Sequence, residues 1–424
     1  MFIKKSTSVF LVFRLIFSLI LLVQTGFAQT RKFIISNMSG VARQGDPVLI
    51  TRENLLALMD IPEDKIPVLF QNDLVLPSQT DDLTGDGIWD ELAFQVDMER
   101  NSSLEIKLKW MDKSDAPTYP AKVSACFKVS DLENGKYQNV SSEIRPDSLS
   151  ANRLSSRYCL GGPVWESEKI AFRHCFDNSN FNGVLGKIKS GLLLDSIVSF
   201  QSGTNRKYNW GSELLSPDSG FGLGGYAMVE KGKLIPLRKP GSVLYKFISS
   251  GPVRAMFDLV YEDYNVGGNS INVRHRISIW AGKNWYKSDL LFTGFLGQKE
   301  LVFGFSLPPG SQQSEFSKSN SSHSAISVHV NQGKEGNGHF GFGLLFPTND
   351  FLGQGKILAK SSSPDSLSTS SFVRFKIRSG QTLSVMNFAA WEKPDDRFAN
   401  AFNFNGIIQE EADRLEQALK IGKK

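Results

Sequence analysis

The feature that most constrains this chain is a long series of short segments in which apolar and polar residues alternate. These segments recur between Val123 and Ala389, and Gly, Asn, Ser or Pro usually separates them. Alternation with a period of two is typical of β-strands that bury one face. Because strands without intervening helices must pack sheet on sheet, we predict a mainly β fold with a large antiparallel sandwich over residues 119–424.

The composition fits a globular protein with a sizeable core. Hydrophobic residues make up 41% of the 424 residues and charged residues 21%, and the counts of Phe (31) and Gly (37) are high. Large side chains that alternate with tight turns suit a many-stranded protein. The net charge of +5 is spread along the chain without a dense run of Lys or Arg, so we expect no nucleic-acid partner.

A smaller β-sandwich-like domain is predicted for residues 29–118. Thr51 is suited to cap a short helix from Arg52 to Met59. Strict alternation from Leu104 to Trp110 indicates a half-buried strand that closes the domain.

The end of the chain has a different pattern. Ile408, Ala412, Leu415 and Leu419 recur at helical spacing among charged residues. This periodicity predicts one amphipathic C-terminal helix. We expect it to dock on the sandwich, and a helix that binds a partner protein is the alternative.

The N-terminus has the pattern of a secretory signal peptide over residues 1–28. Two lysines precede an apolar run from Val9 to Val23, and small residues lead to a cleavage site after Ala28. A retained membrane anchor is the alternative, but Arg14 interrupts the apolar run. We therefore predict a periplasmic or extracellular protein with no membrane anchor after cleavage.

An Asp-rich loop in the first domain resembles the first half of a calcium-binding loop. Oxygen-bearing groups recur at alternate positions. However, Ala93 occupies the twelfth position, where an EF-hand loop needs a bidentate glutamate. A structural calcium site is one interpretation, and a turn rich in Asx hydrogen bonds without an ion is the other. The candidate ligands are Asp82, Thr84, Asp86, the carbonyl of Ile88, and Asp90.

The stretch from Tyr158 to Lys187 contains several side chains that could bind a small polar ligand or react with it. Trp165 is suited to stack on a sugar ring or, alternatively, to cover the core. Glu166 is a further candidate catalytic residue. Arg173 could hold a substrate carboxylate or form a structural salt bridge. His174 is a candidate base, against the alternative of a buried core imidazole.

A second polar surface is predicted on the strand from Ile271 to Trp280. Its alternate positions put Arg274, Arg276 and Trp280 on one face, while His275 lies on the apolar face with the core. The polar face either meets a ligand or simply faces solvent.

Taken together, these patterns define the candidate site. Tyr208 is a candidate acid or base, and a buried tyrosine bonded to a carbonyl is the alternative. We expect the tryptophan, glutamate and arginines to converge on one hollow of the large sandwich. The predicted catalytic residues are Glu166, Arg173, His174 and Tyr208, and the predicted substrate-binding residues are Trp165, Lys187, Trp210, Arg274, Arg276 and Trp280.

The cysteines do not form a disulfide framework. Only Cys126, Cys159 and Cys175 occur. Cys159 and Cys175 could pair in an oxidising compartment, but the sequence favours buried thiols.

Several motifs together resemble domain-of-unknown-function family 4861. The resemblance implies secretion by Gram-negative polysaccharide degraders and a main body similar to the galactose-mutarotase-like β-supersandwich. Members often have a tyrosine where this chain has His174. The motifs are GGPVWESEKIAFR from Gly161 to Arg173, Gly186-Lys187, Gly220 to Gly225, Gly251 to Arg254 with Ala255, Phe257 and Tyr261, and Arg276-Ile277-Ser278 with Ala281-Gly282.

The function expected from this resemblance is action on saccharides, since the superfamily holds epimerases, polysaccharide lyases and sugar-binding proteins. We predict a lyase or epimerase that acts on acidic or neutral poly- or oligosaccharides in polysaccharide degradation. Proton abstraction beside a carboxylate needs a cation and a base, which the arginines with His174 or Tyr208 would supply. The alternative is a non-catalytic sugar-binding protein of a polysaccharide-utilisation system.

Overall fold

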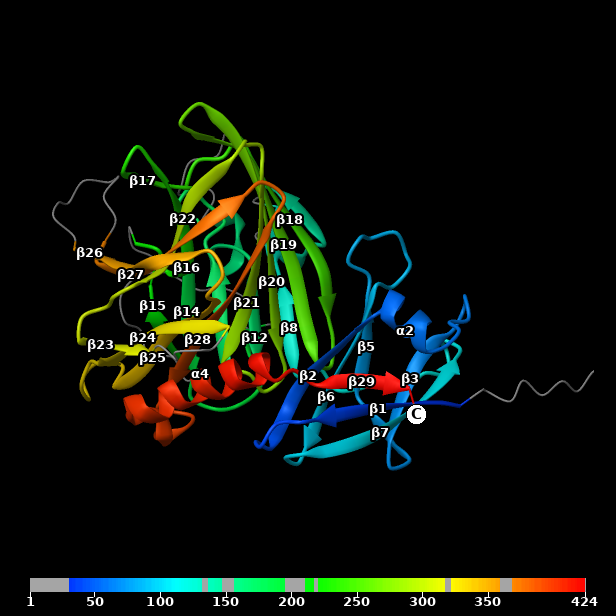
Figure 1. Ribbon diagram of the computed structural model, residues 1–424. Coiled ribbons are helices and arrows are strands. Elements are labelled where there is room, and N and C mark those ends of the chain that lie inside the picture. The colour runs from blue at the N-terminus through cyan, green and yellow to red at the C-terminus, as the bar shows by residue number, and fades with distance from the viewer. Residues whose placement is uncertain are drawn as a thin grey trace, which may run out of the picture.

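In the computed structural model the chain forms a small β-sandwich beside a large one, with a C-terminal helix that lies against the large sandwich and leads into a strand of the small one (Figure 1). The predicted signal peptide and Tyr208 lie outside the described residues. The structure describes residues 30–131, 136–146, 156–194, 210–216, 220–316, 322–358 and 368–423.

The small domain packs two sheets around a core that includes Phe33 and Phe94. The Thr51 side chain accepts a hydrogen bond from the Asn54 N–H and so caps α2 (Arg52–Leu58), as predicted. One sheet has the strand order β29 (Lys420–Lys423), β1 (Arg31–Asn37), β7 (Ser102–Met111), β3 (Ile66–Gln71), β4 (Leu74–Leu76), and the other has the order β2 (Arg43–Thr51), β6 (Glu91–Met98), β5 (Ser78–Asp81).

The large domain is built on a nine-stranded antiparallel sheet. Its strand order is β11 (Ser142–Ile144), β18 (Ser242–Ser250), β19 (Arg254–Val266), β20 (Asn269–Trp280), β21 (Trp285–Thr293), β28 (Thr382–Trp391), β25 (His339–Pro347), β24 (His323–Asn331), β23 (Ser311–Phe316).

Two five-stranded sheets pack against one face of the nine-stranded sheet, as their shared apolar core shows. A small pair, β9 (Lys128–Ser130) and β10 (Tyr137–Asn139), lies beside them. The first five-stranded sheet has the order β15 (Gly211–Leu215), β14 (Asn182–Lys187), β13 (Ile170–His174), β12 (Val164–Ser167), β8 (Val123–Cys126), and the second has the order β17 (Lys233–Pro236), β16 (Leu223–Glu230), β22 (Gln298–Ser306), β27 (Ser370–Arg378), β26 (Phe351–Ile357).

The alternation read from the sequence decides which face each strand buries. On β20 the residues Ile271, Val273 and Ile277 lie in the shared core, and His275 is buried with them. The alternate residues of β20 point to the other face of the nine-stranded sheet, which we call the second surface. The mainly β fold with a large supersandwich is therefore confirmed.

The C-terminal segment connects the two domains. After the short 3₁₀ helix η3 (Asp396–Ala399), helix α4 (Ala401–Glu416) packs Phe404, Ile408 and Ala412 onto the second surface of the nine-stranded sheet. Strand β29 then pairs antiparallel with β1 and so adds the end of the chain to the small domain, which the sequence pattern did not indicate. Among the described residues, no helix is long and apolar enough to cross a membrane.

Candidate functional site

Trp165, the predicted sugar platform, lies inside the large sandwich. Its side chain is 1% exposed and stacks on Phe172, with ring centroids 5.7 Å apart. Phe257 and Tyr286 of the opposite sheet contact its other edges. The structure thus places this indole in the core, where no ligand reaches its face.

Glu166 and Lys187 form a buried ion pair next to Trp165. The Lys187 ammonium also donates to the carbonyls of Ser167 (2.5 Å) and Gly191 (2.7 Å). The backbone N–H groups of Leu193 and Leu194 donate to the Glu166 carboxylate. Burial lowers the pKa of Lys187, while Glu166 opposes that shift. These contacts fix the segment that follows β14, which is a structural arrangement.

Arg173 and His174 have partners inside the sandwich as well. The Arg173 guanidinium forms an ion pair with Glu213 and donates to the carbonyl of Leu160 at 3.1 Å. The His174 ring bonds Asn182 through Nδ1 at 2.7 Å and the Tyr261 hydroxyl through Nε2 at 3.2 Å. Burial lowers the pKa of His174 to about 4, so its imidazole is neutral near neutral pH.

The expected convergence on one hollow is therefore wrong. Glu166, Arg173 and Lys187 belong to β12, β13 and β14, and each is almost fully buried in an ion pair. Trp210 is only partly buried and packs beside Leu160 and neighbouring apolar residues. The local sequence was rich in polar groups because the sandwich needs partners for the charges it buries.

The three cysteines are buried thiols that form no disulfide with one another, as the sequence favoured.

The polar stripe of β20 does lie on the second surface of the nine-stranded sheet, beside the small domain. Arg276 forms a bidentate pair with Asp258 at 2.8 and 2.9 Å and donates to the Leu83 carbonyl at 3.3 Å. Trp280 is buried beneath the guanidinium of Arg254, 5.3 Å from its centroid, and Arg274 is exposed. The small domain therefore covers part of the surface on which we expected a ligand.

The Asp-rich loop lies at this domain boundary. The Asp82 carboxylate accepts from the N–H groups of Gly85 (2.6 Å) and Gly87 (2.8 Å) and from the Thr84 hydroxyl. Asp86 accepts from the Ile88 N–H, and Asp90 accepts from the Leu83 and Thr84 N–H groups. Hydrogen bonds to the loop backbone lower the pKa of Asp82. The calcium site stays a prediction.

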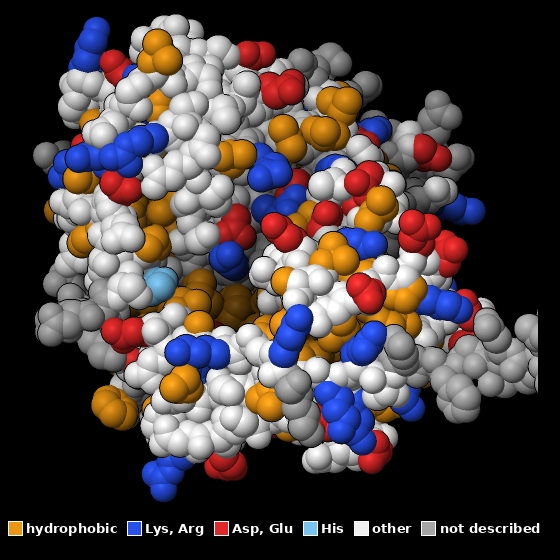
Figure 2. Space-filling model, turned by 45° about the vertical axis from the view of Figure 1, so that its right-hand side comes forward, with side chains coloured by type: hydrophobic (Ala, Val, Ile, Leu, Met, Phe, Trp, Pro, Cys, Tyr) orange, Lys and Arg blue, Asp and Glu red, His pale blue; other side chains and the backbone are white. Residues whose placement is uncertain are grey.

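An open site lies further along the same surface, at the junction of the sheet, α4 and the small domain. Here a cavity of about 410 Å³ is lined from β2, β21, β24, β25, β28 and the helical segment. Lys287 and Met386 are cross-strand partners, and so are Met386 and Leu345. Figure 2 shows a hollow with a hydrophobic floor between the two domains and charged side chains on its rim. We call this space the junction cavity.

Trp285 is the aromatic residue of the junction cavity. Its side chain is 5% exposed, and no hydrogen-bond partner for its indole N–H occurs among the described residues. Trp165 shares that lack of a partner. Both indoles belong to apolar clusters, Trp165 inside the sandwich and Trp285 on the second surface of the nine-stranded sheet beside Phe388. On the wall beside Trp285, the Lys287 ammonium pairs with Asp289 at 2.9 Å, and the Ser384 hydroxyl donates to the same carboxylate.

A network of charges closes the cavity on the side of the small domain. Arg43 pairs with Asp46 at 2.6 Å, and Arg414 of α4 pairs with Glu411 at 2.9 Å. Arg414 also lies 3.7 Å from Asp46, and the buried Lys283 lies 3.8 Å from Glu411. Burial lowers the pKa of Lys283. The residues that line the cavity itself include three cations, Arg43, Lys287 and Arg414, and two carboxylates, Asp46 and Glu411.

His323 supplies an imidazole to the same cavity. It is half-buried, and its Nδ1 lies 3.0 Å from the Ser322 hydroxyl. Burial lowers the pKa of His323, while Glu416 opposes that shift. The ring is therefore neutral near neutral pH and able to accept a proton.

Residues 35–421 match the family described as "Domain of unknown function (DUF4861)". The chain belongs to the DUF4861 family. A search of the curated proteins found no match.

Three solved structures resemble this DUF4861 protein in fold, at low sequence identity. An α-mannosidase from Enterococcus faecalis V583 has a TM-score of 0.46 at 9% identity, covering 98% of this chain and 48% of that one. A glycosyl hydrolase family 38 protein from Enterococcus faecalis has a TM-score of 0.45 at 9% identity, covering 94% and 48%. A Klebsiella pneumoniae subsp. pneumoniae MGH 78578 protein described as an aldose 1-epimerase has a TM-score of 0.33 at 7% identity, covering 70% and 96%. The chain spans about half the length of the two Enterococcus proteins.

The sequence reasoning missed the residues of the junction cavity. Alternation along β21 puts Trp285, Lys287 and Asp289 on one face, and Arg276 is the cross-strand partner of Asp289. The hairpin between β20 and β21 could therefore have extended the predicted polar stripe to Lys287. No local pattern connects Arg43 and Arg414 with that face, because they reach it only through the tertiary fold.

Proposed function

We propose that this protein binds an acidic saccharide in the junction cavity. The observation that carries the proposal is a cavity of about 410 Å³ whose lining brings the edge of Trp285 together with the cations Lys287 and Arg414. Ligand cavities of roughly 300–1,000 Å³ combine apolar walls with a few polar groups, and this one does so.

The chemistry of the lining explains the preference for an acidic sugar. The apolar face of a sugar ring packs well on apolar side chains such as Trp285, Leu345 and Met386, which line the cavity. Lys287 and Arg414 place positive charge where a uronate carboxylate would lie. Arg414 is already held by Glu411 and Asp46, so little of its motion remains to be lost on binding.

A second candidate function is elimination or epimerisation of that saccharide. The observation that favours it is His323, whose neutral imidazole lines the same cavity as Lys287 and Arg414. Proton abstraction beside a carboxylate needs a base and a cation, and these residues would fill both roles. This assignment replaces His174 as the candidate base.

The test of binding is a calorimetric titration of uronate oligosaccharides into the wild type and two single variants. Lys287→Met removes a cavity cation, and we expect about a tenfold loss of affinity. Lys32→Met is the matched control, because Lys32 is also a strand lysine in an ion pair at 2.9 Å, with similar exposure (41% against 39%). Equal affinities for the two variants would contradict the proposal.

Catalysis is tested separately. Elimination from a uronate creates a conjugated double bond, so new absorbance near the ultraviolet edge would mark a lyase, and inversion of a sugar centre without that signal would mark an epimerase. His323→Gln should abolish either activity while saccharide affinity remains. Binding without any product supports the non-catalytic alternative.

We also propose that the protein is exported and acts in polysaccharide degradation in the periplasm or outside the cell. The support is the signal-peptide pattern of residues 1–28. N-terminal sequencing of the protein from a periplasmic fraction should begin at Gln29, and retention of Met1 would contradict export.

A further inference from the structure

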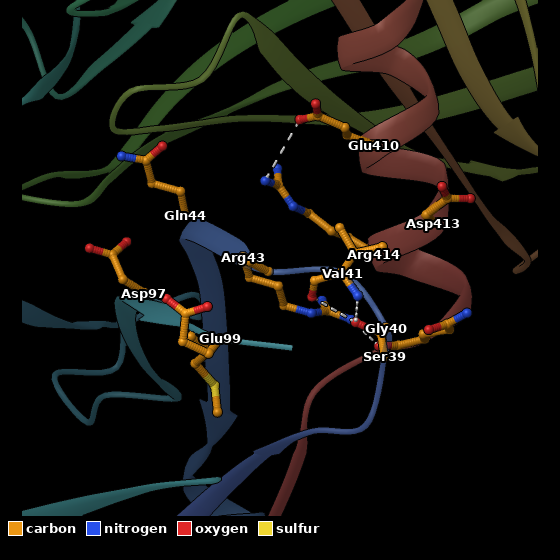
Figure 3. Close-up of a pocket in the computed structure, with 13 residues that line it drawn as sticks. Ser39, Gly40, Val41, Arg43, Gln44, Asp97, Glu99, Glu410, Asp413 and Arg414 are labelled. Carbon is orange, nitrogen blue, oxygen red and sulfur yellow. Dashed lines mark hydrogen bonds and ion pairs between the residues drawn. The ribbon is translucent and has the colours of Figure 1, made fainter. Parts of the chain in front are cut away.

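A second hollow adjoins the junction cavity. It is a cleft of about 820 Å³ between the small domain and α4, and Arg43 and Arg414 line both spaces. Figure 3 shows Gln44, Asp97 and Glu99 on the side of the small domain, with Glu410 and Arg414 projecting from the helix opposite. We call this space the acidic cleft.

The acidic cleft carries the opposite charge to the junction cavity. Its carboxylates are Asp97, Glu99, Glu410 and Asp413, against the two arginines. One oxygen of Asp97 accepts the Gly45 N–H at 2.7 Å, and the exposed Glu410 lies 4.0 Å from Arg414. The junction cavity has three lining cations and two lining carboxylates, so the sign changes from one space to the next.

The boundary between the two spaces is firmly held. The side chain of Arg43 is 3% exposed, pairs with Asp46, and donates from Nε to the Asn37 amide oxygen at 3.0 Å. Arg414 is fixed by Glu411 and Asp46. These two arginines are therefore fixed in place. A ligand that occupies both spaces passes from a positively charged lining to a negatively charged one at this boundary.

We infer that the ligand is an oligosaccharide in which an acidic unit adjoins a neutral, hydroxyl-rich unit; this inference rests on the proposed function. The acidic unit lies in the junction cavity, and the neutral unit lies in the acidic cleft. Carboxylates accept hydrogen bonds from sugar hydroxyls, but they repel the carboxylate of a second uronate. The cleft thereby selects against a polymer made of uronates alone.

The experiment compares the affinities of two oligosaccharides of equal length, one alternating uronate and neutral sugar and the other made of uronate alone. It uses the wild type, the double variant Asp97→Asn/Glu99→Gln, and the control Glu63→Gln/Asp64→Asn, which removes two exposed carboxylates of the small domain outside both spaces. We expect the wild type and the control to prefer the alternating ligand by about tenfold. The cleft variant should reduce that preference to about twofold, mainly by binding the homopolymer more tightly.

The outcomes separate the two levels of the account. Equal binding of both ligands by the wild type, or an unchanged preference in the cleft variant, overturns the inference while the junction cavity remains a saccharide site. If neither ligand binds the wild type, the proposed function fails and this inference fails with it.

Discussion

Two regions of this molecule contain clusters of charged, aromatic and imidazole side chains. They differ in whether a ligand can reach these side chains. The sheet of β12, β13 and β14 holds Glu166, Lys187 and His174 in internal hydrogen bonds and ion pairs. The junction cavity holds Trp285 and Lys287 beside open space. The residues of the first region are close together in the sequence and buried in the fold. Those of the second region are far apart in the sequence and line an open cavity.

The difference teaches that a local concentration of polar residues does not by itself mark a binding site. A sandwich that buries charges must also bury their partners, and neighbouring strands supply those partners at short sequence separation. A ligand site needs unmet hydrogen-bonding groups and room beside them. The predictions below separate the two regions by asking which changes affect stability and which affect binding.

The largest expected effect of a single substitution is that of Lys187→Met. Removing the ammonium leaves Glu166 buried and charged without its partner, so we expect the free energy of unfolding to fall by about 3–5 kcal/mol. Denaturant titration measures it, and the double variant Lys187→Met/Glu166→Gln should recover part of the loss. A Lys187→Met protein of normal stability that had lost saccharide affinity would show that this pair is functional.

The next effect is a loss of stability in acid from the buried histidines. Burial lowers the pKa of His174 to about 4 and that of His275 to about 3, below the value of about 6.5 in the unfolded chain. The unfolded state then binds more protons, so stability is full above about pH 6.5 and falls as the pH drops toward 4. For His174 alone the loss approaches roughly 3 kcal/mol.

Denaturant titrations at about pH 7 and pH 4.5 check this prediction. The variant His174→Gln retains hydrogen-bonding groups but does not titrate, so its stability should depend on pH about half as steeply as that of the wild type. An unchanged slope would mean that His174 is not the group responsible.

A third effect contrasts the two tryptophans whose indole N–H groups lack partners among the described residues. Trp165→Phe should lower the free energy of unfolding by about 2 kcal/mol, because it leaves a void in the core, and it should leave saccharide affinity unchanged. Trp285→Phe should weaken saccharide binding about fivefold, because it removes part of the cavity wall, and it should also lower stability, since the indole is 5% exposed. Thermal denaturation and calorimetric titration of both variants test the contrast, and the reverse pattern would exchange the roles of the two regions.

The smallest effect concerns the Asp-rich loop at the domain boundary. If its carboxylates hold calcium as predicted, millimolar calcium should raise the free energy of unfolding by about 1 kcal/mol over the chelated protein. Asp82→Asn should abolish that gain. Equal melting temperatures with calcium and with chelator would mean that hydrogen bonds alone stabilise the loop.

The sequence predicted much of the fold because strand periodicity is a local property. Alternation on β20 correctly placed Ile277 and His275 in the core, and Thr51 correctly marked the start of α2. The return of β29 to the small domain was not predictable, since Lys420–Lys423 pairs with residues near the other end of the chain. The junction cavity was missed for the same reason, because Arg43, Trp285 and Arg414 meet only after the domains pack.

A crystal structure with a bound uronate oligosaccharide would show which region holds the ligand. We expect a sugar ring in the junction cavity, in contact with Trp285, with its carboxylate beside Lys287 or Arg414. A ligand bound elsewhere, for example over the exposed Arg274 on β20, would contradict this expectation.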